Sequence, residues 1–168
     1  FIQQQNVDSI RQVYSWILGR LNTASWTEVQ LLAPYAFIAT LVMLLSRRTL
    51  DVMRLGDTEA SSVGLRPQVV RFLVIAAASL GTAASVSVSG LIAFVGIIVP
   101  HAVRLLAGTS NRIVLPLSVL YGAAFLAFVD LLGRSLVSPA EIPIGVITAF
   151  CGAPFFVVVL RTSRKALA

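Results

Sequence analysis

Long apolar runs separated by short polar segments dominate the chain, and they predict membrane-spanning helices. A helix needs about 20 residues to cross a hydrocarbon layer roughly 30 Å thick. Runs of about this length cover 29–45, 113–132 and 142–160. A fourth run, 69–108, is too long for one crossing, and its small, polar stretch SVSVSG (85–90) predicts a break between two. The pattern therefore predicts five spans.

The segment before these runs, 6–26, has a different pattern. Apolar residues recur there at helical spacing with polar residues between them: Val7, Ile10, Val13, Tyr14, Ile17, Leu18 and Leu21. A helix with one apolar face and one polar face is typical of a segment that lies along a membrane surface. We therefore expect an amphipathic helix over 6–26.

Composition supports a membrane protein. The chain has 57% hydrophobic and only 12% charged residues, with a mean hydropathy of +0.89, which is more apolar than a soluble domain of this length needs. The expected fold class is all-α, a polytopic transmembrane helical bundle. The net charge of +6 does not indicate nucleic-acid binding, because the arginines lie in short loops between apolar runs. The single cysteine, Cys151, excludes an internal disulfide.

The basic residues predict the orientation of the five spans. Alternate loops face opposite sides, so the loop 46–67 and the C-terminus share one side, and 6–26 and 133–141 share the other. Ten basic residues fall on the first side and three on the second: Arg47, Arg48, Arg54, Arg66, Arg71, Arg104, Arg112, Arg161, Arg164 and Lys165 against Arg11, Arg20 and Arg134. Positive loops remain cytoplasmic. We therefore expect the loop 46–67 and the C-terminus in the cytoplasm.

The loop 46–67 predicts two short helices. Thr49 can cap a helix that Gly56 ends, and Asp57 can cap a second that Gly64 ends. One interpretation is an ordered surface connection. The other is a docking element for a cytoplasmic partner, because each helix would carry a small apolar face: Leu50 and Met53, then Ala60 and Val63.

Two features mark the long run 69–108. Its first half is rich in alanine, glycine and serine, which predicts a helix buried in a bundle, because small residues let helices approach closely in lipid. Its second half ends in Pro100, His101 and Arg104. We expect Pro100 to kink or end the helix and Arg104 to reach the cytoplasmic surface. His101 is either a hydrogen-bonded interface residue or a ligand or base, and no other Cys or His accompanies it.

Four stretches together resemble one protein family. SGLIAFVGIIVPHAVRLLAG (89–108), EIPIGVITAFCGAPFF (141–156), RLGDTEASSVGL (54–65) and QVYSWILGRLNTASW (12–26) are similar to the membrane-spanning subunit of ABC importers for iron-siderophores, haem and cobalamin. The resemblance covers the C-terminal half of the family's usual ten-span subunit. It implies that residues 1–168 are the C-terminal half of such a permease domain.

The resemblance implies transport and not catalysis by this chain. In the family, two permease subunits, identical or different, form a central pathway in the cytoplasmic membrane. Two cytoplasmic ATPase subunits bind their loops, and an external binding protein delivers the chelate. A ferric siderophore is then the expected substrate. No cofactor is expected on this chain, because the partner subunit uses the ATP.

The resemblance also implies roles for particular residues. The ATPase-coupling positions are Leu55, Gly56, Asp57, Glu59, Ala60 and Gly64. The signature positions are Gly90, Phe94, Gly96, Pro100, His101 and Arg104. The outer-gate positions are Trp16 and Gly19, and the binding-protein docking positions are Asp130 and Arg134. The spacing of this last pair also permits a plain ion pair within one helix.

Arg20 departs from the family pattern, which usually has small residues in the turn of the outer helix. Two other functions are possible from the residues alone. An intramembrane enzyme could use His101 and Asp130 as acid and base, but no nucleophile converges with them. A metal-ion permease should carry several charged or histidine ligands within its spans, and His101 is the one histidine in the sequence.

Overall fold

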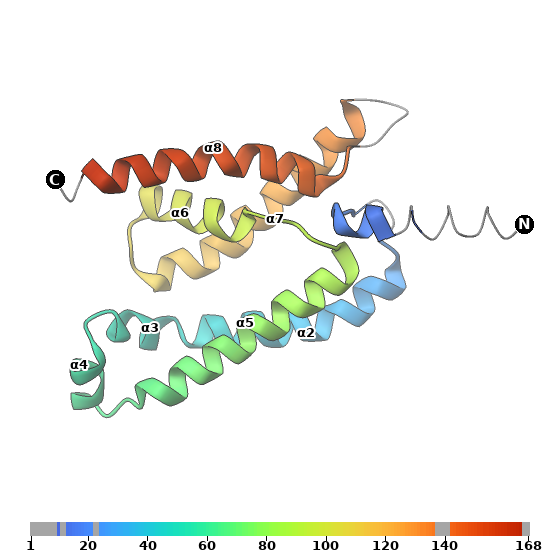
Figure 1. Ribbon diagram of the computed structural model, residues 1–168. Coiled ribbons are helices and arrows are strands. Elements are labelled where there is room, and N and C mark those ends of the chain that lie inside the picture. Colours follow the sequence, from blue (N-terminus) through green and yellow to red (C-terminus); the bar gives the residue numbers. More distant parts are fainter. Residues whose placement is uncertain (1–9, 11–12, 22–23, 137–141, 166–168) are drawn as a thin grey trace, which may run out of the picture. The chain divides into compact units, whose positions relative to one another are not determined.

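The computed structural model describes residues 10, 13–21, 24–136 and 142–165. Within these ranges the regular structure is helical, with no strand, as the all-α prediction requires. Figure 1 shows the elements and their order. Their bounds are α2 (Trp26–Leu45), α3 (Arg47–Met53), α4 (Asp57–Ser62), α5 (Pro67–Ser89), α6 (Val95–Ala107), α7 (Asn111–Ser135) and α8 (Ile144–Lys165).

Three of these helices are long and apolar enough to cross a membrane. They are α2 with 20 residues, α5 with 23 and α7 with 25. α6 has only 13 residues, and α8 has 22, of which 144–160 include no charged residue. The structure thus confirms three of the predicted spans as full-length helices. The second half of the run 69–108 instead forms a helix shorter than one crossing.

The predicted break inside 69–108 is confirmed. α5 ends at Ser89, and Gly90 follows with a positive φ of 70° before α6 begins at Val95. Pro100, however, does not end the return helix, because α6 continues from it to Ala107. A proline removes a single helical hydrogen bond, here the one toward Gly96, and the turns on either side keep theirs. Arg104 lies in the last turn of α6.

The outer helix is shorter than predicted. Ile10 and residues 13–17 are helical, Leu18 forms a turn, and a separate helix, α2, begins at Trp26. Residues 6–9, 11–12 and 22–23 of the predicted range lie outside the described residues. The prediction of one helix over 6–26 was wrong in its C-terminal part, because Gly19 follows the turn at Leu18 with a positive φ of 73° and a capping box of Ser25 and Glu28 then starts α2. The Ser25 hydroxyl accepts from the Glu28 amide (3.3 Å), and the Glu28 carboxylate accepts from the Ser25 amide (2.9 Å).

The described chain forms two compact units. One contains Ser25–Val88 and Pro100–Tyr121, and its buried residues include Ala39, Ala60, Ala77, Val103 and Val114. The other contains the residues before Ser25, Ser89–Val99 and the chain from Gly122 onward, and its buried residues include Val99, Val129, Ile144 and Thr148.

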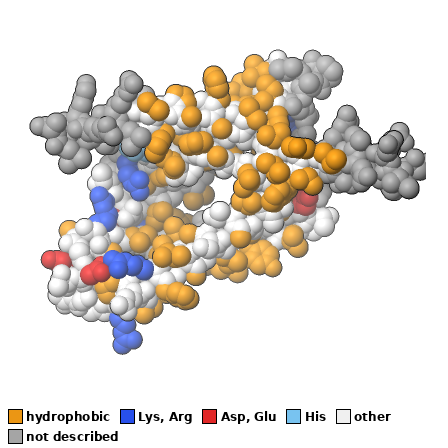
Figure 2. All heavy atoms as spheres, viewed as in Figure 1, with side chains coloured by type: hydrophobic (Ala, Val, Ile, Leu, Met, Phe, Trp, Pro, Cys, Tyr) orange, Lys and Arg blue, Asp and Glu red, His pale blue; other side chains and the backbone are white. Residues whose placement is uncertain are grey.

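The small-residue face of α5 is largely exposed. Gly81 packs closely on Ala39 of α2, where an added Cβ would lie 2.9 Å from the alanine Cβ, but Ala77 is the only buried residue of the helix. The expectation that α5 is buried in a bundle is therefore not met by this chain alone. Figure 2 shows hydrophobic side chains spread widely over the visible surface. Large apolar surfaces of this kind are typical of contact with lipid or with other polypeptides.

Candidate coupling and docking sites

The loop 46–67 contains two short helices, as predicted, but their first residues differ from the prediction. α3 begins at Arg47 after Ser46, whose side chain makes no capping bond, and Thr49 lies inside the helix. α4 begins at Asp57, and its N-cap is Gly56 with a φ of 125°. Gly56 thus starts the second helix and does not end the first. Thr49 lies in the middle of α3, and Asp57 is the first residue of α4. Neither residue therefore occupies an N-cap position.

The end of α4 agrees with the prediction that Gly64 terminates it. The Leu65 amide donates to the Ala60 carbonyl (3.1 Å), and the Gly64 amide donates to the Ser61 carbonyl (3.0 Å). These two bonds define a Schellman motif with the residue after the cap in the left-handed region, and Gly64 has a φ of 83°. The motif fixes the direction in which the chain leaves α4 toward α5.

An aspartate of α3 attaches the loop to the start of α7. The two carboxylate oxygens of Asp51 accept separate hydrogen bonds, one from the Ser110 hydroxyl (2.7 Å) and one from the Asn111 amide (2.7 Å). The Arg54 guanidinium donates to the Thr109 carbonyl. The Ser110 hydroxyl and the Asn111 amide lower the pKa of the Asp51 carboxyl below its ordinary value of 3.8. Hydrogen bonds to the charged form stabilise the carboxylate at the helix N-terminus.

An ion pair attaches α4 to the start of α5. The Arg71 guanidinium lies 2.6 Å from the Asp57 carboxylate, and both side chains are about half exposed. An exposed pair of this kind is screened by salt and contributes little stability. The loop is thus held at both of its helices, more firmly at α3 than at α4.

The predicted coupling residues divide into exposed and buried positions. Leu55 is 72% exposed, Val63 is 66% exposed and Glu59 is also exposed, so these side chains are available to a partner. Ala60 is fully buried at 0% exposure. Its expected place on a docking face was wrong, because its side chain packs inside the loop while its carbonyl accepts the bond that ends α4.

The predicted outer-gate and signature residues meet through their backbones. The Arg20 amide donates to the Ser89 carbonyl (2.9 Å), and the Leu91 amide donates to the Trp16 carbonyl (3.4 Å). A Cβ on Gly90 would overlap the Trp16 carbonyl, and one on Gly19 would lie 2.5 Å from the Leu91 carbonyl oxygen. The end of the outer helix is therefore pinned to the break after α5.

The start of α8 joins the same contact. The Gly145 amide donates to the Leu18 carbonyl (3.1 Å), and a Cβ on Gly145 would overlap that carbonyl. Thr148, one turn later, is fully buried and donates to the Gly145 carbonyl (3.1 Å). We call residues 16–20, 89–91 and 145 the outer-mouth clamp. Three segments far apart in sequence meet there without any large side chain between them.

The remaining signature residues are divided between the two compact units. Phe94 has a φ of 66°, the only positive φ of a described residue other than glycine, and its ring packs directly on Gly152 of α8. Gly96 lies in the first turn of α6 with open space beside it. Pro100, His101 and Arg104 belong to the other compact unit, where His101 is half-buried and Arg104 is exposed. Within the described ranges, no three His, Cys, Asp or Glu residues are placed to hold a metal ion.

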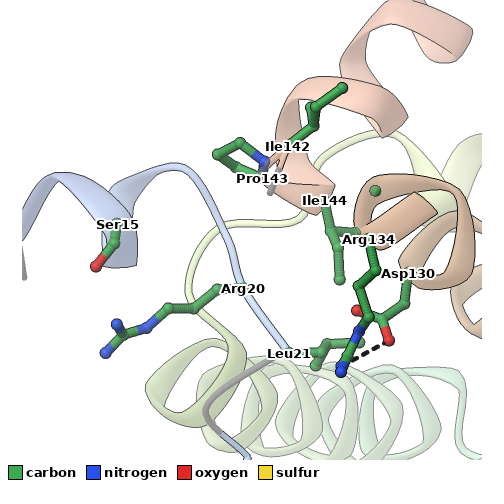
Figure 3. A pocket seen from close by; sticks show the side chains of 9 residues that line it. Ser15, Arg20, Leu21, Asp130, Arg134, Ile142, Pro143 and Ile144 are labelled. Carbon is green, nitrogen blue, oxygen red and sulfur yellow. Dashed lines mark ion pairs between the residues drawn. The ribbon is translucent and has the colours of Figure 1, made fainter. Parts of the chain in front are cut away.

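The predicted docking pair lines a pocket of about 150 Å³ near the outer-mouth clamp (Figure 3). The Arg134 guanidinium lies 2.8 Å from the Asp130 carboxylate within α7, with the arginine side chain 47% and the aspartate 22% exposed. Arg20 also lines the pocket, and its side chain extends away from the pair. The plain intrahelical pair is therefore formed, and half of the Arg134 side chain remains accessible.

The FecCD transport family matches residues 1–162, nearly the full sequence. The chain belongs to the FecCD transport family.

Relatives within the FecCD family are permease proteins. The chain is 41% identical over 152 residues to the cobalamin import system permease protein BtuC of Halobacterium salinarum, covering 90% of this chain and 41% of that protein. It is 36% identical over 158 residues to the Fe(3+)-citrate import system permease protein YfmD of Bacillus subtilis, covering 94% and 47%. The chain thus spans about half the length of the curated relatives it matches.

A solved structure has the same fold. An ABC transporter assigned to the metal-chelate type, in an inward-facing conformation, superimposes with a TM-score of 0.84 at 33% identity, over 90% of this chain and 49% of that chain. The chain therefore shares its helical fold with this transporter over 90% of its length.

Three residues that make contacts in this FecCD chain were not predicted from its sequence: Asp51, Ser110 and Gly145. Asp51 and Ser110 are 59 residues apart, so no local pattern connects them, although Ser110 directly before a helix is a recognisable cap. Gly145 lies in the stretch that resembles the last span of the family. Its signal was a glycine in the first turn of a helix, where the smallest side chain is unusual without a close contact.

Proposed function

We propose that this chain is the C-terminal half of the permease subunit of an ABC importer. The observation that carries the proposal is the loop 46–67, a pair of short helices held to α5 and α7 with Leu55, Glu59 and Val63 exposed. A rigid, exposed element of this kind fits a groove on a cytoplasmic ATPase subunit. The ATPase hydrolyses ATP, and this chain provides part of the pathway and no bond chemistry.

The proposed topology places the loop on the cytoplasmic side of the inner membrane. Ten basic residues on that side against three on the other support it. α2, α5 and α7 cross the membrane, and the α6 and α8 segments complete five spans. The C-terminus then lies in the cytoplasm, and the outer-mouth clamp and the Asp130 and Arg134 pair face outward.

The proposed substrate is a metal chelate, and more narrowly a ferric siderophore. Relatives named for import of cobalamin and of ferric citrate support a metal chelate as the substrate. The ferric citrate relative supports iron as the metal of that chelate. A second permease subunit completes the pathway. An external binding protein delivers the chelate to the outer face, where Arg134 is half accessible to a carboxylate on its surface.

Binding of the ATPase subunit by the full-length permease tests the proposal. Glu59→Arg places the opposite charge on the exposed side of α4 and should weaken co-purification of the ATPase about 10-fold or more, as expected when like charges meet at an interface. Ala24→Arg introduces the same side chain at an exposed position outside the loop and before the first residue of α2, and it should leave co-purification unchanged. Equal effects of the two substitutions would contradict a docking role for the loop.

A further inference from the structure

Asp51 connects the loop 46–67, which we call the coupling loop, to the start of α7 through both of its carboxylate oxygens. Oδ2 accepts from the Ser110 hydroxyl and Oδ1 from the Asn111 amide, each at 2.7 Å. The Asn111 amide is one of the unpaired donors at the start of α7. α7 has a cap of its own, because the Ser110 hydroxyl accepts from the Arg112 amide (3.4 Å), and Asp51 of α3 adds a second cap from a distant part of the chain.

Arg54 strengthens the same junction with the opposite polarity. Its guanidinium donates to the Thr109 carbonyl, directly before the two residues that Asp51 contacts. The end of α3 thus both accepts from and donates to three consecutive residues, 109–111. Hydrogen bonds to charged groups are roughly twice as strong as neutral ones. Because they differ in direction, they also oppose sliding of α3 along α7.

The other attachment of the loop is weaker. Asp57 and Arg71 form one ion pair between two side chains that are each 54% exposed, and water and salt compete for both. A force applied to the loop is therefore transmitted more directly through α3 to α7 than through α4 to α5.

We propose that Asp51 is the positioning residue through which movement of the ATPase-bound loop is passed to α7. The inference rests on the proposed function, because it needs an ATPase subunit on the loop. Both carboxylate oxygens of Asp51 already accept hydrogen bonds from residues 110 and 111, so this role needs no contact with the ATPase or the substrate. Its role is to make α3 and the start of α7 move together, so that ATP hydrolysis and transport remain linked.

The test uses the full-length permease with its ATPase and binding protein in liposomes, with ferric citrate and cobalamin as the probes. The quantity measured is the number of ATP molecules hydrolysed per chelate imported. Asp51→Ala should leave ATPase binding unchanged and raise this ratio severalfold. Asp51→Asn retains one acceptor and should give an intermediate ratio. An unchanged ratio in Asp51→Ala would overturn the inference.

Ser25→Ala is the matched control. It also removes a helix cap, that of α2, but outside the junction of α3 with α7. It should leave the ratio of ATP to chelate at the wild-type value. If Ser25→Ala raises the ratio as much as Asp51→Ala, general loss of stability explains the effect and the inference fails.

Two further measurements keep the outcomes separate. If Asp51→Ala does not assemble, Asp51→Asn provides the test. Amide hydrogen exchange at Asn111 should be faster in this variant than in the wild type, and the ratio of ATP hydrolysed to chelate imported should be higher. Faster exchange without a higher ratio overturns the inference. If the wild-type loop does not bind the ATPase, the proposed function fails first. If it binds and couples, and Asp51→Ala keeps the wild-type ratio, the inference fails and the proposed function stands.

Discussion

The Leu91 amide donates a hydrogen bond to the Trp16 carbonyl, and Gly90 beside it leaves no room for a side chain between the two segments. This contact joins the outer helix to the break between α5 and α6. It explains why the break has a glycine at its centre. The residue must adopt a positive φ and also let another backbone approach directly.

Gly90→Ala should destabilise the permease strongly. The left-handed conformation costs a residue with a Cβ roughly 1–2 kcal/mol, and the overlap with the Trp16 carbonyl adds to it. Gly96→Ala is the matched control, because Gly96 is helical with open space around it and should gain about 0.5–1 kcal/mol. Thermal unfolding of the full-length protein in detergent compares the two. Equal unfolding temperatures would show that the contact at Gly90 is not formed.

Gly64→Ala tests the coupling loop without a steric overlap. No atom lies within 4 Å of a Cβ at Gly64, so the cost should be the backbone term alone, about 1 kcal/mol. Gly64→Asn should cost less, because asparagine tolerates the left-handed region. Amide exchange at Leu65, which donates to the Ala60 carbonyl, reports the end of α4 directly. Faster exchange in the asparagine variant than in the alanine variant would contradict the explanation.

Local patterns in the sequence predicted much of the fold. The uniformly apolar runs gave α2, α5 and α7, and the change from alanine and valine to SVSVSG predicted the break at Gly90. Gly64 was assigned correctly to the end of α4. These features depend on neighbouring residues, so they can be read without knowledge of the tertiary structure.

Features that depend on distant contacts could not be predicted in the same way. Asp51 was not selected, because its partners lie 59 and 60 residues away. Ala60 was placed on an exposed face, because its burial depends on how α4 packs in the loop. The start of α2 was a different error. Ser25 and Glu28 have the spacing of a capping box, and the helical pattern of the preceding residues was extended across it.

The attachment of α3 to α7 should persist at neutral and mildly acidic pH and be lost in strong acid. Asp51 has a pKa lowered below its ordinary value of 3.8 in the folded protein. A depressed carboxyl pKa contributes stability that is fully present above the unfolded value and is lost as the pH falls through the folded value. Protection of the Asn111 amide from exchange should therefore stay constant down to about pH 4 and fall below it. In Asp51→Asn this acid-dependent step should be absent, and a step of the same size there would assign it to another group.

Arg134→Glu in the intact transporter should weaken association with the binding protein. The substitution removes the half-exposed guanidinium of the outer pocket and places a second carboxylate one turn from Asp130. If a carboxylate of the binding protein meets Arg134, reversal of the charge should lower the affinity about 10-fold or more, mainly through slower association. The wild-type complex should also be more sensitive to salt than the variant complex, because an exposed pair is screened.

Asp130→Asn separates docking from the intrahelical pair: it frees Arg134 and should leave the affinity unchanged or raise it. The measurements are the affinity for the binding protein and its salt dependence in both variants. Membrane insertion and ATPase binding check that the variants are folded. Wild-type affinity and salt dependence in a folded Arg134→Glu protein would restrict Arg134 to its pair with Asp130.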